Sequence, residues 1–358
     1  MDNENWPTVV RPPRTKLLLK LGALFVLVYF LSGCTQTCWG SVPPTLKIGL
    51  VAPFEGLHRP LGYEVLFAVK LALQERNVWA GQGYQVELVA LNDFDDPAEA
   101  ARQAKALVSD PQVVGIIGHL SSAATAAAVP VYQVAEMAVI VPWTVEAGVL
   151  DSSPGVVSLA AESTEAVEAL ESFGQAQGFS KIMTWATYNL TPLAADTEAI
   201  QLRGEATKAG EIIVSLKAAD ISLPLFGEPD IGSPQVVQVA KSAANGLIFA
   251  SPGPAPADLP DGLVFTEAYE ALAGFPPGPR AVLAYDAAQV LLDALDQATI
   301  KTGGPPTRAD IRGVIGDIQH RGLSGEIIFD EKGRRQAASV WIYQISREQY
   351  PGVLLEVD

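Results

Sequence analysis

Residues 47–54 read Lys-Ile-Gly-Leu-Val-Ala-Pro-Phe, a short apolar run that ends in residues typical of turns. Such a run predicts a buried β-strand. The next segment places Val65, Ala68, Val69 and Ala72 at a helical spacing, so these side chains share one face of an α-helix. A buried strand followed by an amphipathic helix is the repeating unit of a parallel sheet covered by helices on both faces.

The same alternation continues and restarts after a break at Ser152–Gly155. Before the break we predict strands at Tyr84–Leu91, Val113–Gly118 and Ala138–Pro142, and helices at Ala98–Ser109 (opened by Asp96 as N-cap and Pro97) and Ser122–Ala135. After it we predict strands at Val156–Ala160, Lys181–Thr187, Glu211–Leu216, Pro224–Gly227 and Leu247–Ser251, and helices at Ser163–Gln177 and Pro192–Lys208. The pattern indicates an α/β protein with two Rossmann-like lobes, each built on a parallel sheet.

The chain is expected to cross between the lobes more than once. The Pro- and Gly-rich stretch Ser251–Gly262 is one crossing segment. Helices are predicted near Pro260–Ala273, Arg280–Ile300 and Thr307–Gln319, and a closing hairpin joins Glu326–Asp330 to Ala338–Ile345 over Lys332-Gly333. The expected N-terminal lobe is 46–158 plus 252–328, and the C-terminal lobe is 159–251 plus 329–358. Ligands of open α/β sheets bind at the carboxyl ends of the strands, which can face a shared cleft here.

The first residues have the organisation of an export signal. Basic residues come first, at Arg11, Arg14, Lys16 and Lys20. An apolar core and small residues then lead to Leu31-Ser32-Gly33-Cys34, which resembles a lipoprotein cleavage site. We therefore expect a signal peptide at 1–33, lipidation of Cys34, a tether at 34–45, and an extracytoplasmic protein anchored to a membrane by lipid. The alternative is an uncleaved anchor, but Lys20 leaves an uncharged run shorter than the ~20 residues of a membrane span.

The composition excludes several classes of function. The 358 residues carry a formal charge of −16, which argues against nucleic acid and anionic lipid as partners. The two cysteines, Cys34 and Cys38, both lie at the signal boundary, so the folded body has neither a disulfide nor a cysteine zinc site. No catalytic motif is present, and His119 is interpreted as a hydrogen-bonded residue at a strand end. We expect no enzyme activity, no cofactor and no metal.

Three motifs carry a family resemblance. They are Gly118-His119-Leu120-Ser121-Ser122 after an apolar strand, Ala284-Tyr285-Asp286-Ala287 opening a long helix, and the segment from Gly322 to Gly333, which fits the pattern G-x-[ST]-G-x-I-x-F-D-x-x-G. Lys47-Ile48-Gly49 and Asp93–Pro97 support them. In this order, the motifs resemble the branched-chain amino-acid-binding proteins of ABC importers. The resemblance implies the type I periplasmic binding protein fold, which closes like a hinge on its ligand.

The resemblance also implies ligand-binding positions. Ser122 is expected to bind the carboxylate of the ligand, and Ser121 or Ser122 caps a helix whose free N–H groups favour an anion. Thr144 corresponds to a threonine that holds both ends of an amino acid, although the turn Pro142-Trp143-Thr144 is one residue shorter than in relatives. The remaining expected site residues are Trp143 as a pocket wall or core residue, Leu61 in place of an aromatic residue, Glu228 or its rival Asp230 for the ammonium group, and Tyr188 in the cleft.

One departure from the family concerns the second lobe. Relatives have a further strand and helix between the segments that correspond to Glu211–Leu216 and Pro224–Gly227. Only Lys217–Ser222 joins them here, and a helical crossover needs at least ~10–12 residues. We therefore expect the second lobe to lack about one βα unit.

The leading hypothesis is a monomeric solute-binding lipoprotein that captures an amino acid, branched-chain or similar, and delivers it to an ABC permease. Closure of the cleft would follow from ligand contacts with both lobes. One alternative is a sensory or scaffold lipoprotein that kept the fold and lost transport. Another is a binder of amides or short acids.

Overall fold

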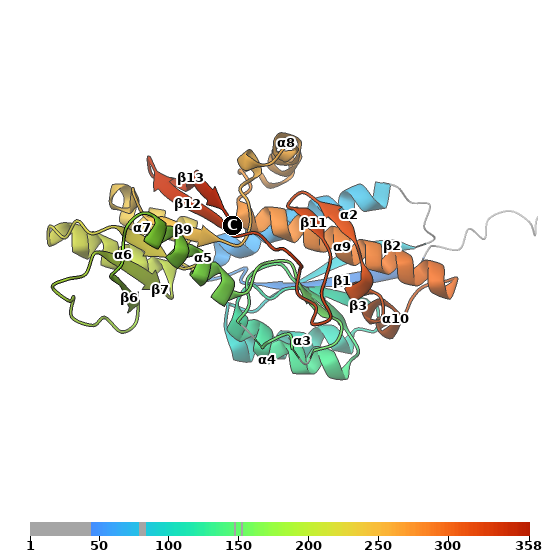
Figure 1. The fold of residues 1–358 in the computed structure, drawn as a ribbon. Helices are drawn as coiled ribbons and strands as arrows, with labels where there is room; N and C mark the ends of the chain where they lie inside the picture. The colour runs from blue at the N-terminus through green and yellow to red at the C-terminus, as the bar shows by residue number, and fades with distance from the viewer. Residues whose placement is uncertain (1–43, 79–83, 147, 152) are drawn as a thin grey trace, which may run out of the picture. The chain divides into compact units, whose positions relative to one another are not determined.

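The apolar strands of the first half form one sheet. In the computed structural model, which describes residues 44–78, 84–146, 148–151 and 153–358, this sheet has five parallel strands in the order β2-β1-β3-β4-β5 (Figure 1). The strands are β1 Thr45–Ala52, β2 Gln85–Asn92, β3 Val113–Ile117, β4 Ala138–Val141 and β5 Val156–Ser158. β3 and β4 are buried along their whole length, as expected for strands with helices on both faces. The sequence-based prediction of this sheet is confirmed.

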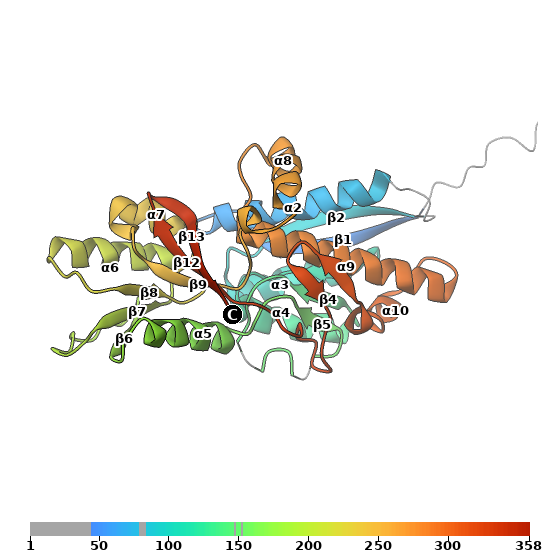
Figure 2. The same ribbon diagram turned by 45° about the horizontal axis from the view of Figure 1, so that its top comes forward.

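Helices cover both faces of this sheet (Figures 1 and 2). The helices are α2 Arg59–Val78, α3 Pro97–Ser109, α4 Ser122–Val134, α8 Gly262–Ala273 and α9 Pro279–Thr302. α2 and α9 pack together over one face, and α3 and α4 over the other. Asp96 is the N-cap of α3, with Pro97 in its first turn, as predicted, because its carboxylate accepts the Glu99 N–H at 2.8 Å.

A second sheet of six strands follows, in the order β13-β12-β9-β8-β7-β6 (Figure 2). Its parallel strands are β6 Ile182–Ala186, β7 Ala199–Arg203, β8 Leu225–Gly227 and β9 Ile248–Ser251, and the antiparallel strands are β12 Trp341–Ser346 and β13 Gln349–Val357. The helices α6 Ala206–Ala218 and α7 Pro234–Ala240 cover one face, and α5 Ser163–Ala176 covers the other. Residues 44–358 form one compact unit.

Two predictions in the second sheet are wrong. The segment predicted as the helix Pro192–Lys208 contains β7, and the predicted strand Glu211–Leu216 lies inside α6. Ala199–Leu202 is buried on both faces, as a central strand is, whereas the buried residues of α6 recur every three to four positions. That helical period outweighs the β-branched composition of the 211–216 run.

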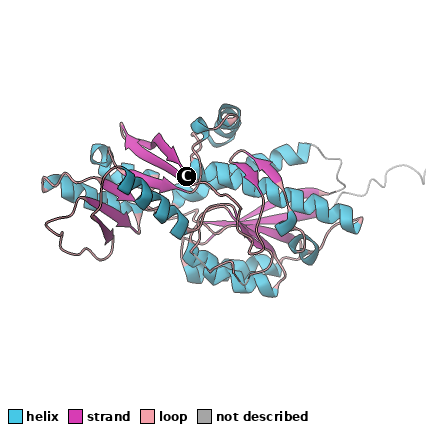
Figure 3. Ribbon diagram, in the orientation of Figure 1, coloured by secondary structure: helices cyan, strands magenta, loops and turns pink. Residues whose placement is uncertain are grey.

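The short connection of the second sheet is therefore not where it was predicted. α6 joins β7 to β8 across the region where a βα unit was expected to be missing. Instead, the parallel neighbours β6 and β7 are joined by residues 187–198, all described, which contain no helix (Figure 3). A parallel crossover usually contains a helix. The shortage thus lies next to β6, which is the edge strand of the sheet.

The C-terminal segment also differs from its prediction. The predicted strands Glu326–Asp330 and Ala338–Ile345 do not form a hairpin with each other, although a single bridge joins Phe329 to Arg335. β11 Gly325–Ile327 pairs with β10 His320–Gly322, and β12 pairs with β9 and β13. The predicted helix Thr307–Gln319 is reduced to α10 Arg308–Arg312 and a 3₁₀ turn at Ile315–Asp317. β12 pairs with β9, a strand far away in the sequence, and not with the neighbouring segment 326–330 as predicted.

The predicted signal peptide, Cys34 and the tether up to residue 43 lie outside the described residues. Within the part of the chain that the structure describes, no helix combines the length and apolar character needed to cross a membrane.

Candidate functional site

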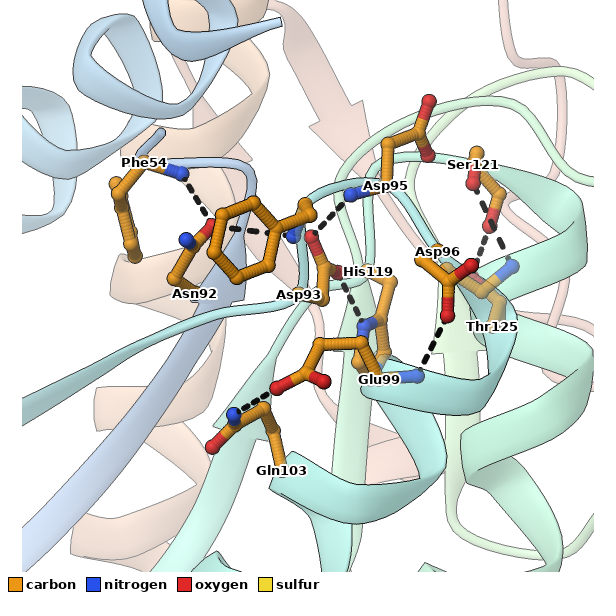
Figure 4. Close-up of polar contacts among 12 residues, drawn as sticks. Phe54, Asn92, Asp93, Asp95, Asp96, Glu99, Gln103, His119, Ser121 and Thr125 are labelled. Carbon is orange, nitrogen blue, oxygen red and sulfur yellow. Dashed lines mark hydrogen bonds and ion pairs between the residues drawn. The ribbon is translucent and has the colours of Figure 1, made fainter. Parts of the chain in front are cut away.

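The loops at the carboxyl ends of β1, β2 and β3 form the first part of the site (Figure 4). The Asn92 side chain ties two of them together, because its amide oxygen accepts the N–H of Phe54 at 2.9 Å and that of Phe94 at 3.0 Å. Asn92 ends β2, and Phe54 follows β1. The pair of bonds fixes the loop after β1 against the loop after β2.

A buried chain of hydrogen-bonded polar side chains lies beneath these loops, on the side of the protein core. His119 Nδ1 lies 2.7 Å from Asp93 Oδ2, and His119 Nε2 lies 3.3 Å from the Tyr132 hydroxyl. His119 is fully buried, and Asp93 also accepts the Asp95 N–H at 3.0 Å. The interpretation of His119 as a hydrogen-bonded residue at a strand end is confirmed. Its role is to hold the 92–96 loop in place.

Asp95 is the side chain that this loop presents. Its backbone has φ +62°, and its carboxylate lies 3.8 Å from His58 Nε2 in the loop after β1. Burial raises the pKa of Asp95, while the Ser121 hydroxyl and His58 act in the opposite direction. Sequence reasoning did not single out Asp95. Its place just past the carboxyl end of β2 was the available signal.

The two serines at the start of α4 already have partners within the chain. Ser121 is the N-cap and accepts the Ala124 N–H at 3.4 Å. The Ser122 hydroxyl accepts the Glu146 N–H at 2.8 Å and so fixes the loop after β4. Ser121 also lies beside Asp95 (Figure 4). The expected role of Ser122 in binding a carboxylate stays a prediction.

The turn after β4 places Trp143 and Thr144 inside the protein. Trp143 is 1% exposed and packs with Ala160 and Leu283. Thr144 is buried, and its hydroxyl donates to the Ala161 carbonyl at 2.8 Å. Thr144 therefore links the turn to the segment that leads into the second sheet.

Arg280, in the first turn of α9, is a charged residue that sequence reasoning missed. It is 4% exposed, and its guanidinium lies 3.8 Å from the centroid of the Trp143 ring. It donates to the carbonyl of Gly232, near the second sheet, at 3.4 Å. Among the described residues no carboxylate lies within 4.0 Å of it. Its position next to Pro279 at a helix start carries no sequence signal for this role.

The second sheet contributes the loop after β8, where Glu228 and Asp230 differ in environment. Glu228 accepts a hydrogen bond from Arg203 at 2.9 Å and one from Gln201 at 3.1 Å. Asp230 has no such partner among the described residues, and water reaches it. Nevertheless, surrounding protein raises the pKa of Asp230 by desolvation; Arg280 opposes the rise, and the charge of Asp95 adds to it.

The remaining predicted residues are Leu61 and Tyr188. Leu61 is half-buried in the first turn of α2 and packs on the core of the first sheet. Tyr188 follows β6 and is 83% exposed. The structure brings together Ser121, Asp95, Arg280, Trp143 and Asp230. Within the described residues there is no group of three or more side chains suited to a metal ion.

This arrangement, loops at the strand ends of two α/β sheets that share one compact unit, is that of a periplasmic binding protein. The family model described as "Periplasmic binding protein" matches residues 45–210 and 193–349, so the chain belongs to this family. The two matches overlap over residues 193–210, which include the end of the connection between β6 and β7, β7 itself and the start of α6. Membership implies an extracytoplasmic location.

Individual relatives are distant. An amino acid binding protein of Pseudomonas aeruginosa is 26% identical over 129 residues, which span 36% of this chain and only 33% of that relative. The branched-chain amino acid transporter substrate-binding protein LivJ of Streptococcus pneumoniae, solved with isoleucine, superposes with a TM-score of 0.77 at 20% identity over 88% of this chain and 99% of its own. A solute-binding protein of an R. palustris ABC transporter, solved with benzoate, has a TM-score of 0.72 at 19% identity over 87% and 96%. These structures are binding proteins of the same fold.

Proposed function

We propose that this protein is the solute-binding component of an ABC importer and holds an amino acid, branched-chain or similar, between its two sheets. One observation carries the proposal: charged groups from both sheets interact at one place. Arg280, which lies in the first turn of α9 on the side of the first sheet, donates at 3.4 Å to the carbonyl of Gly232 in the loop after β8, and the charges of Arg280 and Asp95 shift the pKa of Asp230 in the same loop. A ligand that contacts both sides favours the closed form and is then delivered to a permease.

The lobes in this proposal are 46–158 plus 252–328 and 159–251 plus 329–358. The mature protein is a monomer that a lipid on Cys34 tethers to the membrane. Replacement of Cys34 by Ala tests the anchor: we expect the variant to leave the membrane fraction or to stay unprocessed. Normal lipidated mass in the variant would contradict it.

A thermal-shift screen of the full-length chain in detergent tests ligand binding. The ligands are the twenty amino acids, several amides, and short or aromatic acids that include benzoate. A ligand at ~100 times its Kd stabilises the folded state by about 2.7 kcal/mol, which gives a clear shift in Tm. A specific hit supports the proposal, and a cooperative melt without any hit contradicts it.

A second candidate function is that of a sensory or scaffold lipoprotein. The missing crossover helix between β6 and β7 favours it, since that region is expected to border the cleft in transport proteins. A cooperative melt that no small molecule shifts, together with a histidine kinase rather than a permease encoded nearby, would favour this alternative.

A further inference from the structure

The charged groups of the site are poorly paired, unlike several other charges among the described residues. Elsewhere, Arg76 pairs with Asp296, Arg203 with Glu228, and Lys47 with Asp110. Asp230 and Arg280 belong to no ion pair within the described residues, and Asp95 has only His58, at 3.8 Å. A charged side chain that loses water without gaining an ion-pair partner destabilises the folded state. Such residues are typical of functional sites, where a bound ligand supplies the missing partner.

The two carboxylates, Asp95 and Asp230, form the negative part of the site. They come from opposite sheets, and desolvation by the surrounding protein raises the pKa of each, although the Asp230 side chain stays exposed to water. The charge of Asp95 raises the pKa of Asp230 further, so the two carboxylates repel each other. A cationic group bound beside both of them would replace this repulsion by attraction.

Arg280 forms the positive part. Its guanidinium is buried against the face of Trp143, and neither its Nε nor the Trp143 Nε1 has a hydrogen-bond partner among the described residues. Its hydrogen bond to the Gly232 carbonyl, at 3.4 Å, is long, and this carbonyl also accepts the Tyr350 hydroxyl of β13 at 3.1 Å. The carboxylate of a ligand would form a shorter, charge-assisted bond in its place. The buried carboxylate of Glu64 accepts the Ala281 N–H at 3.0 Å, and Arg280 acts to lower the pKa of Glu64, but the two side chains form no ion pair within 4.0 Å.

We propose that Asp95 and Arg280 are specificity-determining residues, one for each charge of a zwitterionic ligand. Asp95 and Asp230 hold the cationic group, and Arg280 holds the anionic group. The site therefore rejects acids that lack a cationic group, such as benzoate. This inference rests on the proposed function, because it assumes that a small solute binds between the sheets.

Three matched ligands test the inference by isothermal titration of the full-length chain. L-Leucine carries both charges, L-leucinamide lacks the carboxylate, and 4-methylpentanoate lacks the ammonium group. L-Phenylalanine, its amide and 3-phenylpropanoate form a parallel aromatic set, and benzoate is added. We expect an amino acid to bind, with a loss of about tenfold or more in affinity when either charge is removed.

Two variants assign the charges. Asp95→Asn is expected to weaken amino-acid binding about tenfold or more and to leave the affinity for 4-methylpentanoate equal or higher, because a repelling carboxylate is gone. If Asp95 had only a structural role, the variant would lower the affinity for both ligands by the same factor. Glu87→Gln, which removes an exposed carboxylate on β2, the strand that precedes the Asp95 loop, is the matched control and should change the affinity for neither ligand. Arg280→Gln should lower the affinity for 4-methylpentanoate and for leucine, but not the affinity for leucinamide. If Arg280→Gln does not fold, Arg280→Lys, which keeps the charge, is measured in its place.

The outcomes separate this inference from the proposed function. If benzoate or 4-methylpentanoate binds as tightly as any amino acid, or if Asp95→Asn affects both ligands equally, the inference is wrong while solute binding stands. If no amino acid, amide or acid binds, both are wrong.

Discussion

The guanidinium of Arg280 stacks on the ring of Trp143 at 3.8 Å from its centroid, and both side chains are almost fully buried. Arg280 lies in the first turn of α9, whereas Trp143 lies in the turn after β4, so the stack joins two segments far apart in the chain. A cation over an aromatic face is attracted by its quadrupole, more strongly when water is excluded.

Removal of this ring should destabilise the folded state. We expect Trp143→Ala to lower the free energy of unfolding by about 3–5 kcal/mol, because a cavity forms under a buried charge. Trp143→Phe keeps an aromatic face under the guanidinium and should lower the free energy of unfolding by clearly less. Urea denaturation measures both, with Tyr188→Ala as a control: Tyr188 is 83% exposed and should change stability by no more than about 0.5 kcal/mol. Equal losses for the Ala and Phe variants would contradict the stacking argument.

Asp286 should be essential for the packing of α9 against the turn between β10 and β11. Its carboxylate is fully buried and accepts the N–H groups of Leu323 at 2.8 Å and Ser324 at 2.9 Å. Asp286→Ala leaves these donors unsatisfied, at about 1–3 kcal/mol each. We expect a large loss in the free energy of unfolding by urea denaturation, and a smaller one for Asp286→Asn. An alanine variant as stable as the parent would refute this.

His320 should make stability depend on pH. Its hydrogen bond to Asp293, at 2.7 Å, raises the pKa of His320 above its ordinary value near 6.5. The protonated form therefore stabilises the folded state fully below about pH 6.5, and this contribution is lost as the pH rises through the raised pKa. The loss of unfolding free energy from about pH 6 to about pH 9 should be smaller in His320→Gln. Parallel pH profiles of the two proteins would rule the effect out.

The edge strand β6 should promote association when the protein is concentrated. Among the described residues, its one sheet neighbour is β7, and the connection at 187–198 that follows it has no helix to cover it. Unpaired backbone groups on an edge strand recruit other strands, and a lysine there opposes this. Thr184 is an exposed residue of β6, so Thr184→Lys should reduce aggregation on heating, measured by light scattering. Ser215→Lys, on the exposed face of α6, adds the same charge elsewhere and should have little effect.

The elements that could be predicted from the sequence depend on local signals. Asp96 followed by Pro97 marks the start of α3, and the apolar runs of β3 and β4 need helices on both faces whatever their strand partners are. The family motifs around Ser121 and Asp286 likewise lie within short segments. The wrong predictions in the second sheet arose where the local composition favours one structure and the burial pattern favours another. The 211–216 run is rich in β-branched residues, which favour a strand, but its buried positions follow the period of the helix α6.

The sequence by itself determined that this is a two-sheet α/β protein and where most of its strands and helices lie, because hydrophobic period and capping act over a few residues. Only the tertiary structure decided which charges face one another. Asp95, Arg280 and Asp230 come from three distant segments, and no periodicity or spacing relates them. Glu228 and Asp230 are both acidic residues in one short segment of the sequence. In the structure Arg203 pairs with Glu228, whereas Asp230 has no ion-pair partner among the described residues. Electrostatic interaction depends on distance in space and on lost hydration, and packing alone sets both.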